Sequence, residues 1–193
     1  MSLKINIGGS KGWKNYPEKI QQEWKILDCN RNSDYVHDLN SGNSFPISDL
    51  SVDYFYTSNT LEHVRLENQK FVFSEIRRCL KKNGKIRIVV PDFEKAAKLY
   101  LKGQLQSKIK NGPRRNVDSP PTELGYFIGW FCSPDRKFGY SGHGMVYDYK
   151  TLKYYLEDSG LTIIDEKESN LRELDFSRYR GWCLFVEAKK CSN

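Results

Sequence analysis

The sequence predicts an α/β protein in which a mostly parallel β-sheet is flanked by helices. Short runs of aromatic and β-branched residues alternate with segments of helical periodicity through residues 1–110. The last two strand-like segments, 161–165 and 183–188, have no helical pattern between them, so we expect an antiparallel C-terminal strand pair. A stretch at about 102–144 breaks the pattern with prolines, glycines and aromatic residues, and predicts an inserted lid.

The first predicted strands are short and lie in the N-terminal part of the chain. Residues 3–7 alternate apolar and polar side chains and run into a glycine-rich turn at residues 8–12. Segment 13–23 contains Pro17 and allows only a short helix. Three more strands follow, at residues 24–28, 35–38 and 53–57, of which the second is the weakest.

The predicted helices have clear start and stop signals. Val72, Ile76 and Leu80 recur at helical spacing, so we expect a helix over residues 66–82 that ends at the Asn-Gly pair 83–84. A strand follows at 86–90. Further helices are predicted at 93–110, at 122–132 within the lid, and at 148–158, where Asp148 is the expected N-cap.

The composition fits one domain spanning residues 1–193, with the lid inserted into it. The net charge of +7 is spread along the chain, unlike a basic tail that binds nucleic acid, but it favours an anionic partner. The sequence contains no apolar run near the ~20 residues of a membrane span. We also expect no signal peptide, because the first strand begins near Leu3.

The five cysteines form no C-x-x-C pair, and no cysteine–histidine spacing fits a zinc site. The sequence therefore predicts no metal site. It predicts free thiols in a reducing compartment, and so a cytoplasmic location.

Polar residues follow two neighbouring apolar segments, where ligands bind in open α/β sheets. The strand that begins at Asp53 runs into Ser58, Asn59, Glu62 and His63, and the strand at 86–90 runs into Asp92. Ligands lie outside the carboxyl ends of the strands in such sheets. We therefore expect these two segments to form two halves of one site.

A second candidate is the turn after the first strand. Gly8 and Gly9 allow a ligand to approach the backbone closely, and Asp28 ends the next strand, where a carboxylate can accept hydrogen bonds from ribose hydroxyls. An ordinary glycine turn and an ordinary strand-end aspartate are the alternative. The dinucleotide fingerprint is incomplete, because Ser10 stands at its second glycine position, which argues against hydride transfer.

Taken in order, these segments resemble a class I S-adenosylmethionine-dependent methyltransferase with a Rossmann-like fold. The resemblance is greatest to the short type-11-like group associated with polysaccharide and cell-envelope sugar synthesis. It covers most of the chain outside about 102–140. The segments that carry it are Asn6–Ser10, Asp28, His37–Leu39, Ser58–His63, Leu80–Asp92, His143–Gly160 and Leu184–Ala188.

The resemblance implies a role for each matched residue. Gly8 and Gly9, with Asn6 before them, would border the methionine part of the cofactor, and Asp28 would hold its ribose. The adenine would lie beside Asp38 and Leu39. The cofactor side of the reaction centre would be lined by Ser58, Asn59 and Leu61, while Glu62, His63 and Asp92 would face or brace the substrate side.

Two departures from the family pattern bear on the cofactor. Class I enzymes usually carry an acid where this chain has Asn6, so the charge complementarity to the cofactor's amino group is weaker. Ser10 also crowds the turn. These two residues support an alternative hypothesis, that of a non-catalytic, methyltransferase-like binding protein.

Methyl transfer to a hydroxyl benefits from a general base, and histidine suits that role near neutral pH. The chain has three histidines, of which His63 follows the central strand and His143 lies where the lid returns to the core. We prefer His143 as the catalytic base, with His63 as the second candidate. A structural role for each histidine is the remaining possibility.

The acceptor is predicted to be a small polar molecule, most simply a sugar or sugar derivative. Aromatic lid residues such as Trp130 and Tyr140 can pack on a sugar ring, although they can equally hold the lid down. Basic residues from Lys95 to Arg115 could bind an anionic acceptor or form an ordinary solvated face. A tRNA or rRNA methyltransferase is the alternative, with phosphates on the basic residues and bases stacked on the aromatics. The methylated atom and the oligomeric state stay open.

Overall fold

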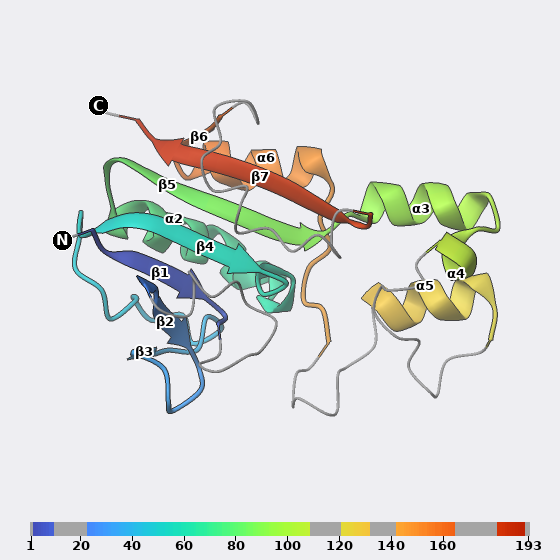
Figure 1. Ribbon diagram of the computed structural model, residues 1–193, viewed down its shortest axis with the longest axis horizontal. Coiled ribbons are helices and arrows are strands. Elements are labelled where there is room, and N and C mark those ends of the chain that lie inside the picture. The colour runs from blue at the N-terminus through green and yellow to red at the C-terminus, as the bar shows by residue number, and fades with distance from the viewer. Residues whose placement is uncertain (1, 10–22, 109–120, 132–141, 165–180, 192–193) are drawn as a thin grey trace.

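The computed structural model describes residues 2–9, 23–108, 121–131, 142–164 and 181–191. They form one seven-stranded sheet in the order β3-β2-β1-β4-β5-β7-β6 (Figure 1). The first five strands are parallel, and β7 runs antiparallel to both β5 and β6. The predicted mixed α/β sheet with an antiparallel C-terminal pair is confirmed. The strands are β1 Lys4–Ile7, β2 Lys25–Asp28, β3 Tyr35–Val36, β4 Val52–Ser58, β5 Leu80–Pro91, β6 Leu161–Ile163 and β7 Cys183–Lys190.

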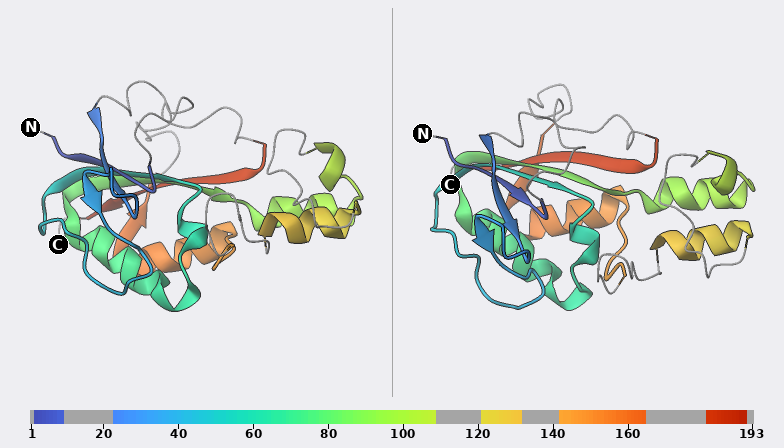
Figure 2. Two further views of the ribbon diagram at one scale, coloured as in Figure 1. Left: turned by 90° about the horizontal axis from the view of Figure 1, so that it is seen from below. Right: turned by 60° about the horizontal axis from the view of Figure 1, so that its bottom comes forward.

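Two helices cover one face of this sheet. Helix α2 (Gln69–Cys79) follows β4 through two short 3₁₀ turns, η1 (Leu61–His63) and η2 (Leu66–Asn68), and α6 (Tyr149–Asp158) precedes β6. Figure 2 shows both helices on the same side of the sheet. The predicted N-cap of α6 is confirmed, because the Asp148 carboxylate accepts a hydrogen bond from the Thr151 amide at 2.7 Å.

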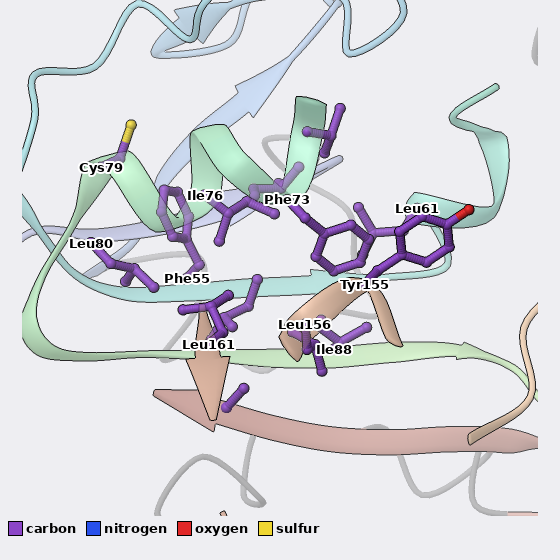
Figure 3. Packing of buried hydrophobic residues seen from close by; sticks show 14 of the residues in the cluster. Phe55, Leu61, Phe73, Ile76, Cys79, Leu80, Ile88, Tyr155, Leu156 and Leu161 are labelled. Carbon is purple, nitrogen blue, oxygen red and sulfur yellow. The ribbon is translucent and has the colours of Figure 1, made fainter. Parts of the chain in front are cut away.

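The main hydrophobic core lies between these helices and the sheet (Figure 3). Phe73 of α2 and Tyr155 of α6 stack with ring centroids 5.5 Å apart. Beneath them, Phe55 of β4 and Ile88 of β5 are completely buried. Burying an aliphatic or aromatic side chain of this size stabilises the fold by about 1.5–3 kcal/mol each, so this layer holds α2 and α6 on the sheet.

Three more helices stand beyond the carboxyl end of β5 (Figure 1). They are α3 (Phe93–Leu101), α4 (Leu105–Lys108) and α5 (Glu123–Phe131). Phe93 lies 5.6 Å from Phe127 and 5.5 Å from Phe131 between ring centroids, so aromatic packing joins α5 to α3. The helix predicted within the lid at 122–132 is therefore present.

The structure corrects two helix boundaries. The helix predicted over 66–82 ends at Cys79, because Leu80 is already extended and pairs with Val52 as the start of β5. The helix predicted over 93–110 is interrupted by Gly103, which has a φ of +62°. The short helix predicted at 13–23 falls almost wholly outside the described residues.

Four cysteines are described, at positions 29, 79, 183 and 191, and all are free thiols as predicted. None of the helices within the described ranges is both long and apolar enough to cross a membrane.

Candidate active site

The carboxyl ends of the parallel strands bring the predicted polar residues to one edge of the sheet. The glycine turn follows β1, Asp28 ends β2, and Ser58 ends β4. The pairing of β1 with both β2 and β4 keeps these three ends side by side. The two segments predicted as halves of one site, 53–63 and 84–92, also meet here because β4 and β5 are paired.

Gly8 is held against the segment that follows β4. Its φ is +75°, and a Cβ atom at this position would lie 2.0 Å from Oγ1 of Thr60. Its amide donates a hydrogen bond to the carbonyl oxygen of Leu27 at 2.9 Å. Only glycine fits here, because both the backbone conformation and the space exclude a side chain. The glycine turn and the start of η1 are therefore in contact.

Asn6 and Gly9 form the buried floor of the same turn. A Cβ on Gly9 would lie 2.5 Å from Nδ2 of Asn6. Asn6 is 1% exposed, and its Oδ1 has no hydrogen-bond partner among the described residues. A buried acceptor without a donor is costly, so this atom is suited to a ligand that brings one.

The acids predicted for ribose and adenine both order their own loops. Oδ1 of Asp28 accepts from the Asn30 amide at 2.8 Å, and Oδ1 of Asp38 accepts from the Asn40 amide at 2.9 Å. Asp28 is half-buried and Asp38 is exposed, while Leu39 packs partly against the core.

The residues predicted around the reaction centre divide into two groups. Ser58 donates to Oδ1 of Asn59 at 3.3 Å, and Asn59 adopts a left-handed backbone with a φ of +52°, which turns the chain sharply after β4. Leu61, in contrast, is completely buried in the main core. Its side chain attaches η1 to the main hydrophobic core.

Glu62, His63 and His143 come together from two distant parts of the chain. One ligating atom from each, a carboxylate oxygen and two imidazole nitrogens, lie within 4.8 Å of one another. The ring centroids of His63 and His143 are 5.0 Å apart. The two histidines that the sequence offered as competing bases are therefore neighbours in one cluster.

Burial changes the protonation of this cluster. Glu62 is 2% exposed, and desolvation raises its pKa to about 8 against smaller opposing effects of its backbone and of Asn59. Desolvation, and then the neighbouring His63, lower the pKa of His143 to about 4. At neutral pH the His143 imidazole is thus uncharged and carries a lone pair.

Residues 142–147, which lead into α6, are docked on η1. Nδ1 of His63 lies 3.3 Å from the carbonyl oxygen of Gly142, and the Met145 amide donates to the carbonyl oxygen of Glu62 at 3.0 Å. A Cβ on Gly144 would lie 2.8 Å from the carbonyl oxygen of Val64, so this close approach requires glycine. These contacts fix His143 next to His63.

Two residues that the sequence did not single out hold this arrangement. Gln69 is completely buried; its Nε2 donates to the carbonyl oxygens of Leu61 at 3.2 Å and Val64 at 2.7 Å, and its Oε1 accepts from the Tyr147 hydroxyl. Asn40 donates to the carbonyl oxygen of His63 at 3.2 Å. A signal for Gln69 was present, because it is a polar residue in line with Val72, Phe73 and Ile76 on the apolar face of α2.

Asp92 has its hydrogen bonds within the fold. It caps α3 by accepting from the Lys95 amide at 3.1 Å, and its Oδ2 lies 3.2 Å from the Lys95 ammonium. The Lys95 ammonium also donates to the carbonyl oxygen of Cys183. Asp92 was predicted either to face the substrate or to brace the substrate side of the site. Its contacts with Lys95 are those of a bracing residue.

The end of α5 reaches the cluster. Phe131 is 3% exposed, and its ring centroid lies 6.3 Å from that of His143 in an edge-on arrangement. Trp130 lies in α5, but its side chain, like Tyr140 and Ser10, is outside what the structure describes.

Comparisons with known proteins agree with this geometry. Residues 21–88 match the family model described as a methyltransferase domain. A comparison with curated proteins found no match.

Solved structures match over nearly the whole chain. An S-adenosylmethionine-dependent methyltransferase from Methanosarcina mazei is 17% identical, with a TM-score of 0.57, and the match covers 99% of this chain and 93% of that one. A chain from the complex between the Haloferax volcanii Trm112 methyltransferase activator and a methyltransferase is 13% identical, with a TM-score of 0.58 and coverage of 100% and 83%.

A third structure contains a bound product. The 1,6-didemethyltoxoflavin-N1-methyltransferase of Burkholderia thailandensis, with 1,6-didemethyltoxoflavin and S-adenosylhomocysteine bound, is 11% identical, with a TM-score of 0.54 and coverage of 99% and 72%. These identities show a shared fold and leave the acceptor open. The match to a methyltransferase domain covers residues 21–88, and the fold is shared with solved S-adenosylmethionine-dependent methyltransferases.

Proposed function

We propose that the protein transfers a methyl group from S-adenosylmethionine to a small polar acceptor, most simply a hydroxyl of a sugar or sugar derivative. The reaction would take place at the carboxyl edge of the sheet, between the glycine turn and the cluster of Glu62, His63 and His143. The observation that carries the proposal is the contact between Gly8 and Thr60, which sets the cofactor turn against the segment that bears Glu62 and His63.

The residues at the turn fit the cofactor. Gly8 and Gly9 let the turn pass close to Thr60 and Asn6, and the buried Oδ1 of Asn6 is an acceptor that matches the cofactor's ammonium group. The carboxylate of Asp28 is suited to the ribose hydroxyls. The adenine is assigned to Asp38 and Leu39, and the remaining cofactor contacts to Ser58 and Asn59. We leave Leu61 out of this set, because its side chain lies in the core.

Methyl transfer requires the protein mainly to orient the acceptor relative to the cofactor. The bound cofactor supplies a methyl group on a sulfonium, which reacts with a nucleophile held in line with it. As the new bond to the acceptor oxygen forms and the sulfur–carbon bond breaks, the hydroxyl proton must leave. An imidazole in the cluster can take it, since His143 is unprotonated at neutral pH. A pKa of about 4 makes His143 a weak base, so we assign proton acceptance to the His63–His143 pair.

The acceptor class is supported by the surroundings of the cluster. Phe131 is 3% exposed and closes the side of the cluster next to His143 with an apolar ring. Two of the basic residues predicted to bind an anion are paired within the fold, Lys95 with Asp92 and Lys98 with Glu94. This pairing favours a small acceptor over an extended polyanion.

The test is methyl transfer from labelled S-adenosylmethionine to a panel of free and nucleotide-linked sugars. We expect His63→Ala and His143→Ala to lower kcat about 100-fold each on an accepted substrate, the usual size of a general-base contribution. His37→Ala is the matched control, since His37 packs on Phe45 outside the cluster. Full activity in both cluster variants would refute the role of the pair. Methylation of bulk RNA, with binding that weakens steeply as salt rises, would contradict the small acceptor.

A further inference from the structure

The cluster of Glu62, His63 and His143 has the ligands of a metal centre. Two imidazoles and a carboxylate are a ligand set that divalent first-row transition ions bind, with three protein ligands leaving at least one position open. The three ligating atoms lie within 4.8 Å of one another. Around an ion with bonds of about 2.0–2.2 Å, neighbouring ligand atoms are roughly 3–3.5 Å apart, so small side-chain movements would close the site.

Independent evidence comes from buried polar atoms that face no partner. Glu62 is 2% exposed, and its Oε2 has no hydrogen bond within the part of the chain that the structure describes. The same holds for Nδ1 of His143. The Glu62 side chain has a hydrogen bond with Asn59, but burial favours its protonated form, and a cation at Oε2 would favour the ionised form instead. An ion bound through Oε2 of Glu62 and Nδ1 of His143 would give both atoms a partner.

The groups that contact the cluster hold its members in place, as the groups behind the ligands do in metal sites. The carbonyl oxygen of Gly142, 3.3 Å from Nδ1 of His63, favours the tautomer that donates from Nδ1 and leaves the lone pair on Nε2. The backbone of Glu62 is fixed by the Met145 amide. The two segments that carry the ligands are thus docked before any ion binds, which lowers the entropic cost of forming a site.

We propose that Glu62, His63 and His143 bind a divalent first-row transition-metal ion, with an open coordination position directed at the acceptor. Binding of the ion stands on the geometry alone, whereas its contact with an acceptor oxygen rests on the proposed function. With the ion bound, both imidazoles are ligands, and the ion replaces the histidine pair as the group that promotes loss of the hydroxyl proton. The ion then lowers the pKa of the bound hydroxyl, and its proton passes to water while the methyl group moves to the oxygen. This inference replaces the expectation of no metal site, which considered only spacing along the chain.

Metal binding is measured directly on tag-free protein treated with a chelator. Calorimetry with Zn²⁺, and visible absorption with Co²⁺, should each give one site per chain. Glu62→Gln, His63→Ala and His143→Ala should each weaken the affinity at least 10-fold. His37→Ala should not, because His37 lies outside the cluster. Cys29→Ser controls for binding by an exposed thiol.

The outcomes separate this inference from the proposed function. No site in the wild-type protein, or unchanged affinity in the three cluster variants, would overturn it. Folding of each variant is checked by circular dichroism and by heat of binding of S-adenosylhomocysteine. Loss of metal with retained S-adenosylhomocysteine binding supports the site. A protein that binds the metal through these residues but not S-adenosylhomocysteine keeps this inference and loses the proposed function.

Discussion

At the scale of single residues, Gly8 does two things that no other residue could do at its position. It adopts a positive φ, and it lets Thr60 approach so closely that a Cβ would collide with its side chain. The first property is shared with Gly42, which has a φ of +70° and nothing within 4 Å of its would-be Cβ. Alanine variants at the two positions therefore distinguish the cost of the left-handed backbone, which both share, from the cost of the close contact, which only Gly8 has.

We predict that Gly8→Ala is far more damaging than Gly42→Ala. Both variants bear the strain of a left-handed alanine, about 1–2 kcal/mol. Only Gly8→Ala must also push Thr60, and with it η1, away from the glycine turn. Chemical denaturation should show a small loss of stability in Gly42→Ala and a larger one in Gly8→Ala, with S-adenosylhomocysteine affinity reduced only in the latter. Equal losses in the two variants would show that the contact with Thr60 does not matter.

The sequence indicates which residues belong to the site, but it does not indicate which of them lie next to one another. It named Glu62, His63 and His143, because ionisable residues after strands and at loop returns are visible in the sequence. It could not show that His63 and His143 adjoin, since they lie on segments far apart in the chain that meet only after folding. Leu61 was grouped with its polar neighbours, whereas the turn of η1 directs its side chain into the core.

At the scale of elements, the site depends on η1 being fastened to α2 and to residues 142–147. Gln69 at the start of α2 makes this connection. Its Nε2 donates to the carbonyl oxygens of Leu61 and Val64, and its Oε1 accepts from the Tyr147 hydroxyl. These carbonyl groups belong to short turns, and that of Leu61 also accepts from the Val64 amide. The side chain of Gln69 takes the place of a secondary-structure partner.

We predict that Gln69→Leu destabilises the protein by about 2–3 kcal/mol, because the Val64 carbonyl oxygen loses the Gln69 amide as its donor and the buried Tyr147 hydroxyl loses its acceptor. Gln104→Leu is the control, since Gln104 is exposed and the same change there should cost little. Urea unfolding gives the stabilities. If η1 is positioned by Gln69, the variant also loses affinity for Zn²⁺. A Gln69→Leu protein as stable as Gln104→Leu would contradict the role assigned to this side chain.

Most elements were predictable because their signals are local, and the errors occur where tertiary contacts prevail. Helix α2 ends at Cys79, before the predicted Asn-Gly stop, since Leu80 gains strand pairing with Val52 and burial in the core. The break of the predicted helix 93–110 had a visible cause in the sequence, because Gly103 readily adopts the positive φ that ends a helix.

At the scale of the whole molecule, a parallel sheet places every catalytic candidate at one edge. Strands β1, β2 and β4 end side by side, and helices α3 and α5 stand beyond the end of β5 (Figure 1). The order of strands could not be derived from the sequence, because it depends on which strands pair and not on where each one lies. The mixed direction could be derived, since the link between β6 and β7 lacks a helical pattern.

The central claim is that this edge binds S-adenosylmethionine despite Asn6 at the position where an acid is usual. Titration calorimetry with S-adenosylhomocysteine tests it most directly, with Asp28→Asn as the site variant and Asp158→Asn as a surface control. We predict one site in the wild-type protein and in Asp158→Asn, and affinity about 10-fold weaker in Asp28→Asn, the effect of losing a hydrogen bond to a charged group. No heat at millimolar S-adenosylhomocysteine, or binding unaffected by Asp28→Asn, would contradict the account.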